Sequence, residues 1–169
     1  TTSPWVFMLA PDDSAEGAFI AGFAAHTLGA HSVVLFYDND DYGRGLRDGL
    51  RAALVVNGLR LAADEPIGTA CDSAQPPGGN ALIAVATPRR QPPDVVVIAA
   101  RTRDAGCVGR QVAARLPGIR LIVGDAVDLD SRFIHTMGAA ADSVYAVTFW
   151  HPDLPGDGSV AFVRAYRRV

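Results

Sequence analysis

The chain has 169 residues, of which 49 % are hydrophobic and 20 % are charged, and its formal net charge is −3. At about 150 residues per domain, this length predicts one domain over residues 1–169, and the apolar content excludes disorder for most of the chain. A pI near 5.7 without a basic tract argues against nucleic acid as a partner. The sequence holds no lysine, which excludes a side-chain Schiff base and a Walker A phosphate loop.

Short apolar runs alternate with helix-like stretches in the first part of the chain. In chain order we expect a strand at 5–9, a helix from 12–14 to about 29, a strand at 33–37, a helix at about 42–56 and a strand at 59–63. The run at 33–37 is continuous and rich in β-branched and aromatic residues, which is typical of a buried parallel strand. The first helix carries a small-residue face at helical spacing, formed by Ala18, Phe19, Ala21, Gly22 and Ala25.

The second part of the chain continues the alternation. It is expected to contain a loop at 66–80, a short helix at about 80–87, a strand at 95–100, a helix at about 104–116, a strand at 120–123, a short helix at 128–137, a strand at 144–149 and a helix at 160–168. The whole pattern predicts a three-layer α/β/α domain with a mainly parallel, Rossmann-like sheet. Ligands lie outside the carboxyl ends of the strands in such sheets, which directs attention to 10–14, 38–43, 101–104 and 124–128.

Cysteines and apolar runs give little structural information. Cys71 and Cys107 are too few for a disulfide framework or a structural zinc site. Two unpaired cysteines are the favoured reading, and one bridge is the alternative if the protein is exported. Because no run of about 18 apolar residues is present, no membrane span is expected. The first residues do not form a signal peptide, so the signal of an exported protein would lie outside this chain.

Two patterns imitate known sites. The glycines at 43–49 resemble a dinucleotide loop, but the third glycine comes one position late and the acidic residues before it would repel a phosphate. The acidic pairs at 12–13 and around 38–41 suit either a magnesium pocket or helix caps. Caps are favoured, because a receiver-type pocket also needs an aspartate after the middle strand and a lysine.

Residues that would support catalysis are scattered. The histidines form no metal-binding pair, and no Gly-x-Ser-x-Gly elbow occurs, so we expect no metal, no cofactor and no enzyme. Glu16 and Glu65 have no evident partner for acid–base work. Cys107 lies near the start of a predicted helix, a position that lowers the pKa of a thiol, but it has no evident base beside it. A flavodoxin-like enzyme is therefore the less favoured alternative.

Several stretches together resemble the periplasmic-binding protein type 1 family, most closely its leucine/isoleucine/valine-binding branch. They read WVFMLAPDDSAEG, SVVLFYDNDDYGRGLRDGLRAALVVNG, CDS, PPDVVVIAARTRDAGCVGRQVAA, LIVGDA, VYAVTFWHPD and AFVRAY. Members of this family are two-lobed receptors that close around a ligand. The resemblance implies that this chain is a second lobe, with the first lobe absent, Trp5 to Ala10 as the incoming hinge side and Thr148 to Asp153 as the return.

The resemblance also implies a ligand site at the strand ends. Tyr42 of the Asp-Tyr-Gly element would line the cleft, and Arg101 and Thr102 would contribute from the loop after the Val-rich strand. Asp125 or Ala126 falls where the family often has an acid that holds a ligand ammonium. Since Arg101 and Asp125 both follow strands, we expect them to lie near each other. They would either pair as a surface ion pair or, as we favour, face the cleft separately and bind a carboxylate and an ammonium.

The function implied is that of an extracytoplasmic binding component of an ABC transporter, with an amino acid or a related carboxylate as ligand. Its partners would be the first lobe and a membrane permease. The alternative is a ligand-sensing domain of the same fold fused to a signalling protein.

Overall fold

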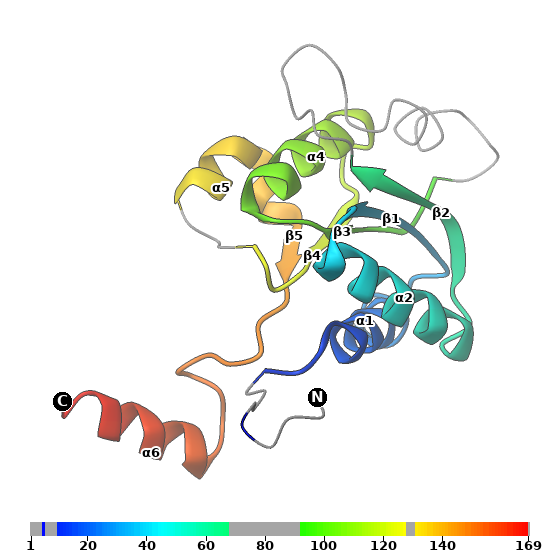
Figure 1. Cartoon of the computed structure of the whole chain (residues 1–169). Coiled ribbons are helices and arrows are strands. Elements are labelled where there is room, and N and C mark those ends of the chain that lie inside the picture. Colours follow the sequence, from blue (N-terminus) through cyan, green and yellow to red (C-terminus); the bar gives the residue numbers. More distant parts are fainter. Residues whose placement is uncertain (1–4, 6–9, 68–91, 128–130, 169) are drawn as a thin grey trace.

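A five-stranded parallel sheet forms the centre of the protein, with the strand order β2-β1-β3-β4-β5. The structure, a computed structural model, describes residue 5 and residues 10–67, 92–127 and 131–168 (Figure 1). The strands are β1 (Ser32–Asp38), β2 (Arg60–Ile67), β3 (Val95–Ala99), β4 (Arg120–Val123) and β5 (Val144–Ala146). Every pairing between neighbouring strands is parallel, so the predicted parallel sheet is confirmed.

Helices cover both faces of the sheet (Figure 1). They are α1 (Asp13–Gly22), the π-helical turn η1 (Phe23–Thr27), α2 (Asp41–Val56), α4 (Thr102–Arg115), α5 (Ser131–Met137), the 3-10 helix η2 (Gly138–Ser143) and α6 (Asp157–Tyr166). The helices α1 and α2 pack on one face, and α4 and α5 pack on the other. The predicted three-layer architecture is therefore confirmed, with α6 lying apart from the layers.

Strand β1 explains how one apolar run serves two cores. Its side chains alternate between the two faces of the sheet. Val33 and Leu35 pack with the helices α1 and α2, whereas Val34 and Phe36 pack with α4 and α5. All four side chains are at most 2 % exposed. A strand buried on both faces needs apolar residues at every position, which is why this run is continuous.

The predicted elements that fall within the described residues are confirmed to within a few residues, with two informative differences. Strand β2 runs to Ile67, so the loop expected from residue 66 begins too early. Pro66 is tolerated because β2 is an edge strand, where a missing N–H leaves no partner unbonded. Strand β5 ends at Ala146 rather than 149, because Ala146 pairs with Val123, the last residue of the neighbouring strand β4. Beyond this point the Thr148 hydroxyl donates to the carbonyl of Trp150 at 2.8 Å.

Other expectations lie outside the described residues. These are the strand at 5–9 apart from Trp5, the short helix at 80–87, most of the loop at 66–80 and the first residues of the helix at 128–137. The reading of two unpaired cysteines is wrong, since Cys107 is disulfide-bonded. Cys71, the chain's other cysteine, lies outside the described residues. Among those described, no helix combines the length and the apolar character that a membrane span requires.

Two of the early aspartates are helix caps. The Asp12 carboxylate accepts a hydrogen bond from the Ala15 N–H at 2.8 Å at the start of α1. The Asp40 carboxylate accepts one from the Gly43 N–H at 2.9 Å at the start of α2. Each bond satisfies a backbone N–H that has no partner within its helix. The interpretation of these two acids as caps is confirmed.

The helices α1 and α2 touch through their backbones. A Cβ atom added at Gly17 would lie 2.4 Å from the Leu50 nitrogen, and one added at Gly49 would lie 2.5 Å from the Ser14 Cα. Real Cβ atoms do not approach other atoms so closely, so both positions require glycine. The contact fixes the position of α1 relative to α2, which begins at the carboxyl edge of the sheet.

The half-buried Asp94 carboxylate links the amino ends of two strands. The Asp94 carboxylate, just before β3, accepts hydrogen bonds from the backbone N–H groups of His31 and Ser32, at 2.8 and 2.9 Å, and from the Ser32 hydroxyl at 3.1 Å. Burial of this carboxyl raises its pKa, but the bonds from His31 and Ser32 outweigh burial and hold the pKa of Asp94 below its ordinary value of 3.8. Ionised Asp94 therefore stabilises the folded state.

Replacing Asp94 with alanine should lower the free energy of unfolding by about 1–3 kcal/mol at neutral pH, because two backbone donors lose their acceptor. Since the folded-state pKa is depressed, this contribution is present above pH 3.8 and is lost as the pH falls through the folded-state value. Urea unfolding at pH 7 and pH 3 measures the effect. Asp48→Ala, which removes an exposed carboxylate, is the control. A difference between wild type and Asp94→Ala that is equally large at both pH values would contradict the assignment.

Candidate ligand-binding site

Three polar segments meet at the carboxyl edge of the sheet. The strands β1, β3 and β4 are parallel neighbours, so the segments that follow them lie at one edge. Tyr42 lies in the first turn of α2 after β1, Arg101 follows β3 and Asp125 follows β4. The structure thus brings three of the predicted site residues to one edge, while their role in binding stays a prediction.

Tyr42 packs against the loop after β4. Its hydroxyl accepts a hydrogen bond from the Ala126 N–H at 3.4 Å. A Cβ atom added at Gly124 would lie only 2.1 Å from this hydroxyl oxygen, so the loop approaches Tyr42 as closely as glycine allows. Burial, together with the neighbouring Glu16 carboxyl, raises the pKa of Tyr42. The hydroxyl is therefore a neutral hydrogen-bonding group next to Asp125 and Ala126.

The same loop is held by Glu16, for which the sequence analysis found no partner. Glu16 lies in α1 and is 1 % exposed. Its Oε1 accepts a hydrogen bond from the Asp125 N–H at 2.7 Å. Its Oε2 is buried, and no hydrogen-bond partner for it is found among the described residues. Burial, followed by the nearby Asp125 and Asp13 carboxylates, raises the pKa of Glu16 to about 8 even though the Asp125 N–H lowers it.

The burial of Glu16 could have been predicted from helical spacing. The buried residues of α1 and η1 include Glu16, Ile20 and Ala24, which are four residues apart. The sequence analysis instead predicted a face that includes Phe19, which is 62 % exposed. If the predicted buried face of this helix is shifted by one residue, it includes Glu16, which then lies at the end nearest the carboxyl edge of the sheet.

Arg101 is held by carboxylates of the β1–α2 connection. Its guanidinium forms an ion pair with Asp40, and its backbone N–H donates to the Asp38 carboxylate at 3.1 Å. Burial alone would raise the pKa of Asp40, but bonds from Gly43 and Arg101 hold it below its ordinary value. Burial raises the pKa of Asp38. The expected alternative of an Arg101–Asp125 pair is not what the structure contains, because the partner of Arg101 is Asp40.

The remaining predicted residues lie beside these groups. Thr102 is the first residue of α4 and is half-buried. Ala126 is half-buried in the loop after β4, while the neighbouring Asp125 is exposed. The Asp125 carboxylate is therefore open to solvent, although its backbone N–H is fixed by Glu16. An exposed carboxylate thus lies on a loop whose backbone is held in place.

A groove of about 470 Å³ opens next to Asp125. Its other walls are Val127 and the chain from Ala146 to His151. This chain includes most of the segment that the sequence analysis expected to be the returning hinge side, at 148–153. The incoming side, at 5–10, is described only at its two exposed end residues.

The far end of the groove leads to α6. The Trp150 indole N–H donates to the Ser159 hydroxyl at 3.0 Å, and its ring meets the Phe162 ring edge-on with centroids 5.3 Å apart. No residue of α6 is buried, and the helix lies apart from the sheet (Figure 1). The side chains of Phe162 and Tyr166 are 55 % and 75 % exposed. The residues that the structure describes thus leave an apolar face of this helix uncovered.

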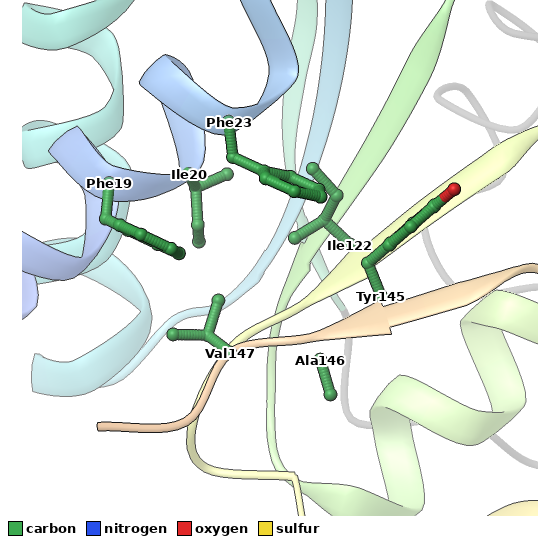
Figure 2. A pocket seen from close by; sticks show the side chains of 7 residues that line it. All are labelled: Phe19, Ile20, Phe23, Ile122, Tyr145, Ala146 and Val147. Carbon is green, nitrogen blue, oxygen red and sulfur yellow. The ribbon is translucent and has the colours of Figure 1, made fainter. Parts of the chain in front are cut away.

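A second, smaller pocket of about 170 Å³ lies between the end of α1 and the edge strand β5 (Figure 2). The Phe23 ring meets the Tyr145 ring edge-on, with centroids 5.4 Å apart. The complete lining is Phe19, Ile20, Phe23, Ile122, Tyr145, Ala146 and Val147. Since the Tyr145 hydroxyl is the one polar side-chain group in this lining, the pocket offers little to orient a polar ligand.

A parallel α/β domain with polar groups and a groove at the carboxyl edge has a counterpart among known proteins. The family model described as periplasmic binding protein matches residues 1–169. The chain belongs to the periplasmic binding protein family. The resemblance inferred from the sequence is thereby confirmed.

Solved structures share the fold of this periplasmic binding protein. A leucine-binding protein from Thermotoga maritima has a TM-score of 0.71 and 23 % identity, with 92 % of this chain and 43 % of that chain covered. A branched-chain amino acid transporter substrate-binding protein from Streptococcus pneumoniae, in complex with isoleucine, has a TM-score of 0.68 and 23 % identity, with 92 % and 42 % covered. A solute-binding protein of an ABC transporter from R. palustris, in complex with benzoate, has a TM-score of 0.66 and 20 % identity, with 92 % and 41 % covered.

The matches cover only part of each similar structure. This periplasmic binding protein chain spans less than half the length of each of the three similar structures. At 20–23 % identity the comparison shows the fold alone. No curated protein sequence matches the chain.

Proposed function

We propose that this chain is the second lobe of a two-lobed solute receptor that binds a small molecule for an ABC transporter and performs no chemistry. The observation that carries the proposal is the groove beside Asp125, which lies at the carboxyl edge and is lined by the chain after β5. Ligand sites in parallel α/β sheets lie at this edge. The match over less than half of each similar structure supports a first lobe as the missing wall of the site.

We propose an amino acid or a related carboxylate as the ligand. The exposed Asp125 carboxylate suits a ligand ammonium, and the Arg101 guanidinium suits a carboxylate. Arg101 now pairs with Asp40, but an exposed ion pair is worth only about 0–1 kcal/mol, so a ligand carboxylate can displace Asp40 at little cost. Isoleucine and benzoate in similar structures both carry a carboxylate, which agrees with this ligand class.

The proposed location is extracytoplasmic. Cys107 is disulfide-bonded, and structural disulfides persist in oxidising compartments such as the bacterial periplasm. The family to which the chain belongs is described as periplasmic. The partners in this proposal are the first lobe and a membrane permease that receives the ligand.

Removal of the Asp125 carboxylate should weaken binding of L-isoleucine to the two-lobed receptor by about 10- to 100-fold, the scale of a significant contact residue. Arg101→Ala should weaken both L-isoleucine and benzoate, because each carries a carboxylate. Calorimetry with amino acids, aromatic carboxylates and neutral sugars measures the ligand class.

Arg51→Ala is the matched control for the arginine substitution, since Arg51 also forms an exposed ion pair, with Asp64 at 3.4 Å, but lies on α2 away from the strand ends. Asp48→Ala serves the same purpose for the carboxylate. If sugars bind best, or if neither Asp125→Ala nor Arg101→Ala changes affinity, the proposed ligand class is wrong.

A further inference from the structure

The environment of Glu16 is unusual for a carboxyl group. The side chain is 1 % exposed, yet within the described part of the chain only Oε1 has a hydrogen-bond partner, the Asp125 N–H at 2.7 Å. Oε2 is buried without one. A buried ionised carboxylate with one oxygen unsatisfied is costly, whereas the protonated acid removes the charge. Burial therefore favours a proton on this group.

The groups that face Glu16 come from each of the elements packed around it. They are Asp13 from α1, Tyr42 from α2 and Asp125 from the loop after β4. The two charges among them are carboxylates, and both disfavour a negative Glu16. Burial and these charges raise its pKa to about 8. At neutral pH Glu16 thus carries a proton.

The loop geometry connects this proton to the candidate ligand site. Gly124 approaches both groups, since an added Cβ would lie 2.8 Å from the Glu16 Oε1 and 2.1 Å from the Tyr42 hydroxyl oxygen. The Asp125 N–H bonds to Glu16 and the Ala126 N–H bonds to Tyr42. Glu16 and Tyr42 thus hold the backbone of the loop that carries the exposed Asp125 carboxylate.

We infer that Glu16 is a positioning residue that holds the Asp125 loop and releases its proton when a ligand ammonium binds at Asp125. This inference rests on the proposed function, because it takes Asp125 as the ammonium site. A cation placed at Asp125 stabilises the negative form of Glu16, so Glu16 releases its proton to solvent when the ligand binds. A carboxylate ligand without an ammonium leaves the proton in place.

The sign of the pH effect follows from linkage. Below pH 8 the free receptor carries the proton, and binding of an ammonium ligand releases it. Affinity for L-isoleucine should therefore rise with pH, by up to about tenfold per pH unit, and level off above the pKa of free Glu16. Affinity for benzoate should not rise in this way. Glu16→Gln keeps the size and a hydrogen-bond acceptor but cannot release a proton, so it should abolish the rise.

Two measurements test the inference, and the first needs no ligand. In the 169-residue chain, the NMR amide signal of Asp125 should shift with a midpoint near pH 8. The shift should be absent in Glu16→Gln and unchanged in Glu65→Gln, which alters the chain's only other glutamate. A wild-type Asp125 amide that does not titrate in this range would overturn the inference, whether or not the receptor binds amino acids.

The second measurement is calorimetry of the two-lobed receptor with L-isoleucine at pH 7, in buffers of different ionisation enthalpy. Wild type should release a fraction of a proton, Glu65→Gln should do the same, and Glu16→Gln should release none. Binding of L-isoleucine without proton release overturns the inference and leaves the proposed function standing. A titrating Asp125 amide in a receptor that binds no amino acid overturns the proposed function and leaves the positioning role of Glu16 supported.

Discussion

The 169-residue chain alone should bind L-isoleucine at least about 100-fold more weakly than the two-lobed receptor, a loss of about 2.7 kcal/mol or more. A small-molecule site normally buries about 70–90 % of its ligand's surface. The groove beside Asp125 provides only one wall of such a site, so the opposite side of the ligand would remain in water. Each hydrogen bond missing from that side removes about 0.5–1.5 kcal/mol.

Calorimetry on both proteins under one set of conditions measures this difference. The fold of the isolated chain must first be verified, by circular dichroism and by a cooperative thermal transition, so that weak binding is not confused with unfolding. Mixing this chain with a separately produced first lobe should restore part of the affinity. Equal affinity of the isolated chain and the two-lobed receptor would disprove the two-lobe proposal.

Gly43→Ala should destabilise the fold by about 3 kcal/mol or more, at the upper end of what overpacking costs. An added Cβ at Gly43 would lie 2.0 Å from the Asp38 carbonyl oxygen and 2.8 Å from the Asp38 nitrogen. Both atoms belong to the backbone, so no side-chain rotation relieves the clash. The N-terminus of α2 would have to move, and Tyr42 and the Asp40 cap would move with it.

Gly45→Ala is the matched control on the same helix. The atom nearest to its added Cβ is the Asp13 Oδ2, at 2.5 Å, which is the end of a side chain that can rotate away. Alanine is also favoured over glycine in a helix by about 1 kcal/mol, so the control should be close to neutral. Thermal and urea unfolding compare the two variants. Similar stabilities for Gly43→Ala and Gly45→Ala would contradict the close approach of α2 to the end of β1.

The sheet could be predicted because its signals are local. The apolar run at 33–37 and the run at 95–100 are continuous, and both became strands buried on two faces. Alternation with helices then fixed the parallel arrangement. The end of β5 could not be predicted in the same way, because it depends on where the neighbouring strand β4 ends rather than on the apolar pattern, which continues to residue 149.

The candidate site could be predicted only in part. The carboxyl-end rule indicated Tyr42, Arg101 and Asp125, and the structure brings these segments to one edge. It could not reveal that Arg101 pairs with Asp40, because two residues 61 positions apart meet only through the tertiary fold. Glu16 was missed since a lone glutamate in a polar helix start is usually solvated. Only the packing of α1 on the sheet shows that this one is buried.

The backbone contact between α1 and α2 has a mechanical consequence. Gly17 and Gly49 let these helices touch so closely that neither can slide or rotate without atomic overlap. Glu16 and Tyr42, one on each helix, are therefore carried by one rigid pair of helices, so in the proposed receptor little entropy would be lost in ordering them on binding. In the proposed receptor we therefore expect bending on ligand binding to occur elsewhere, in the irregular chain after β5, where residues 147–156 join the sheet to α6.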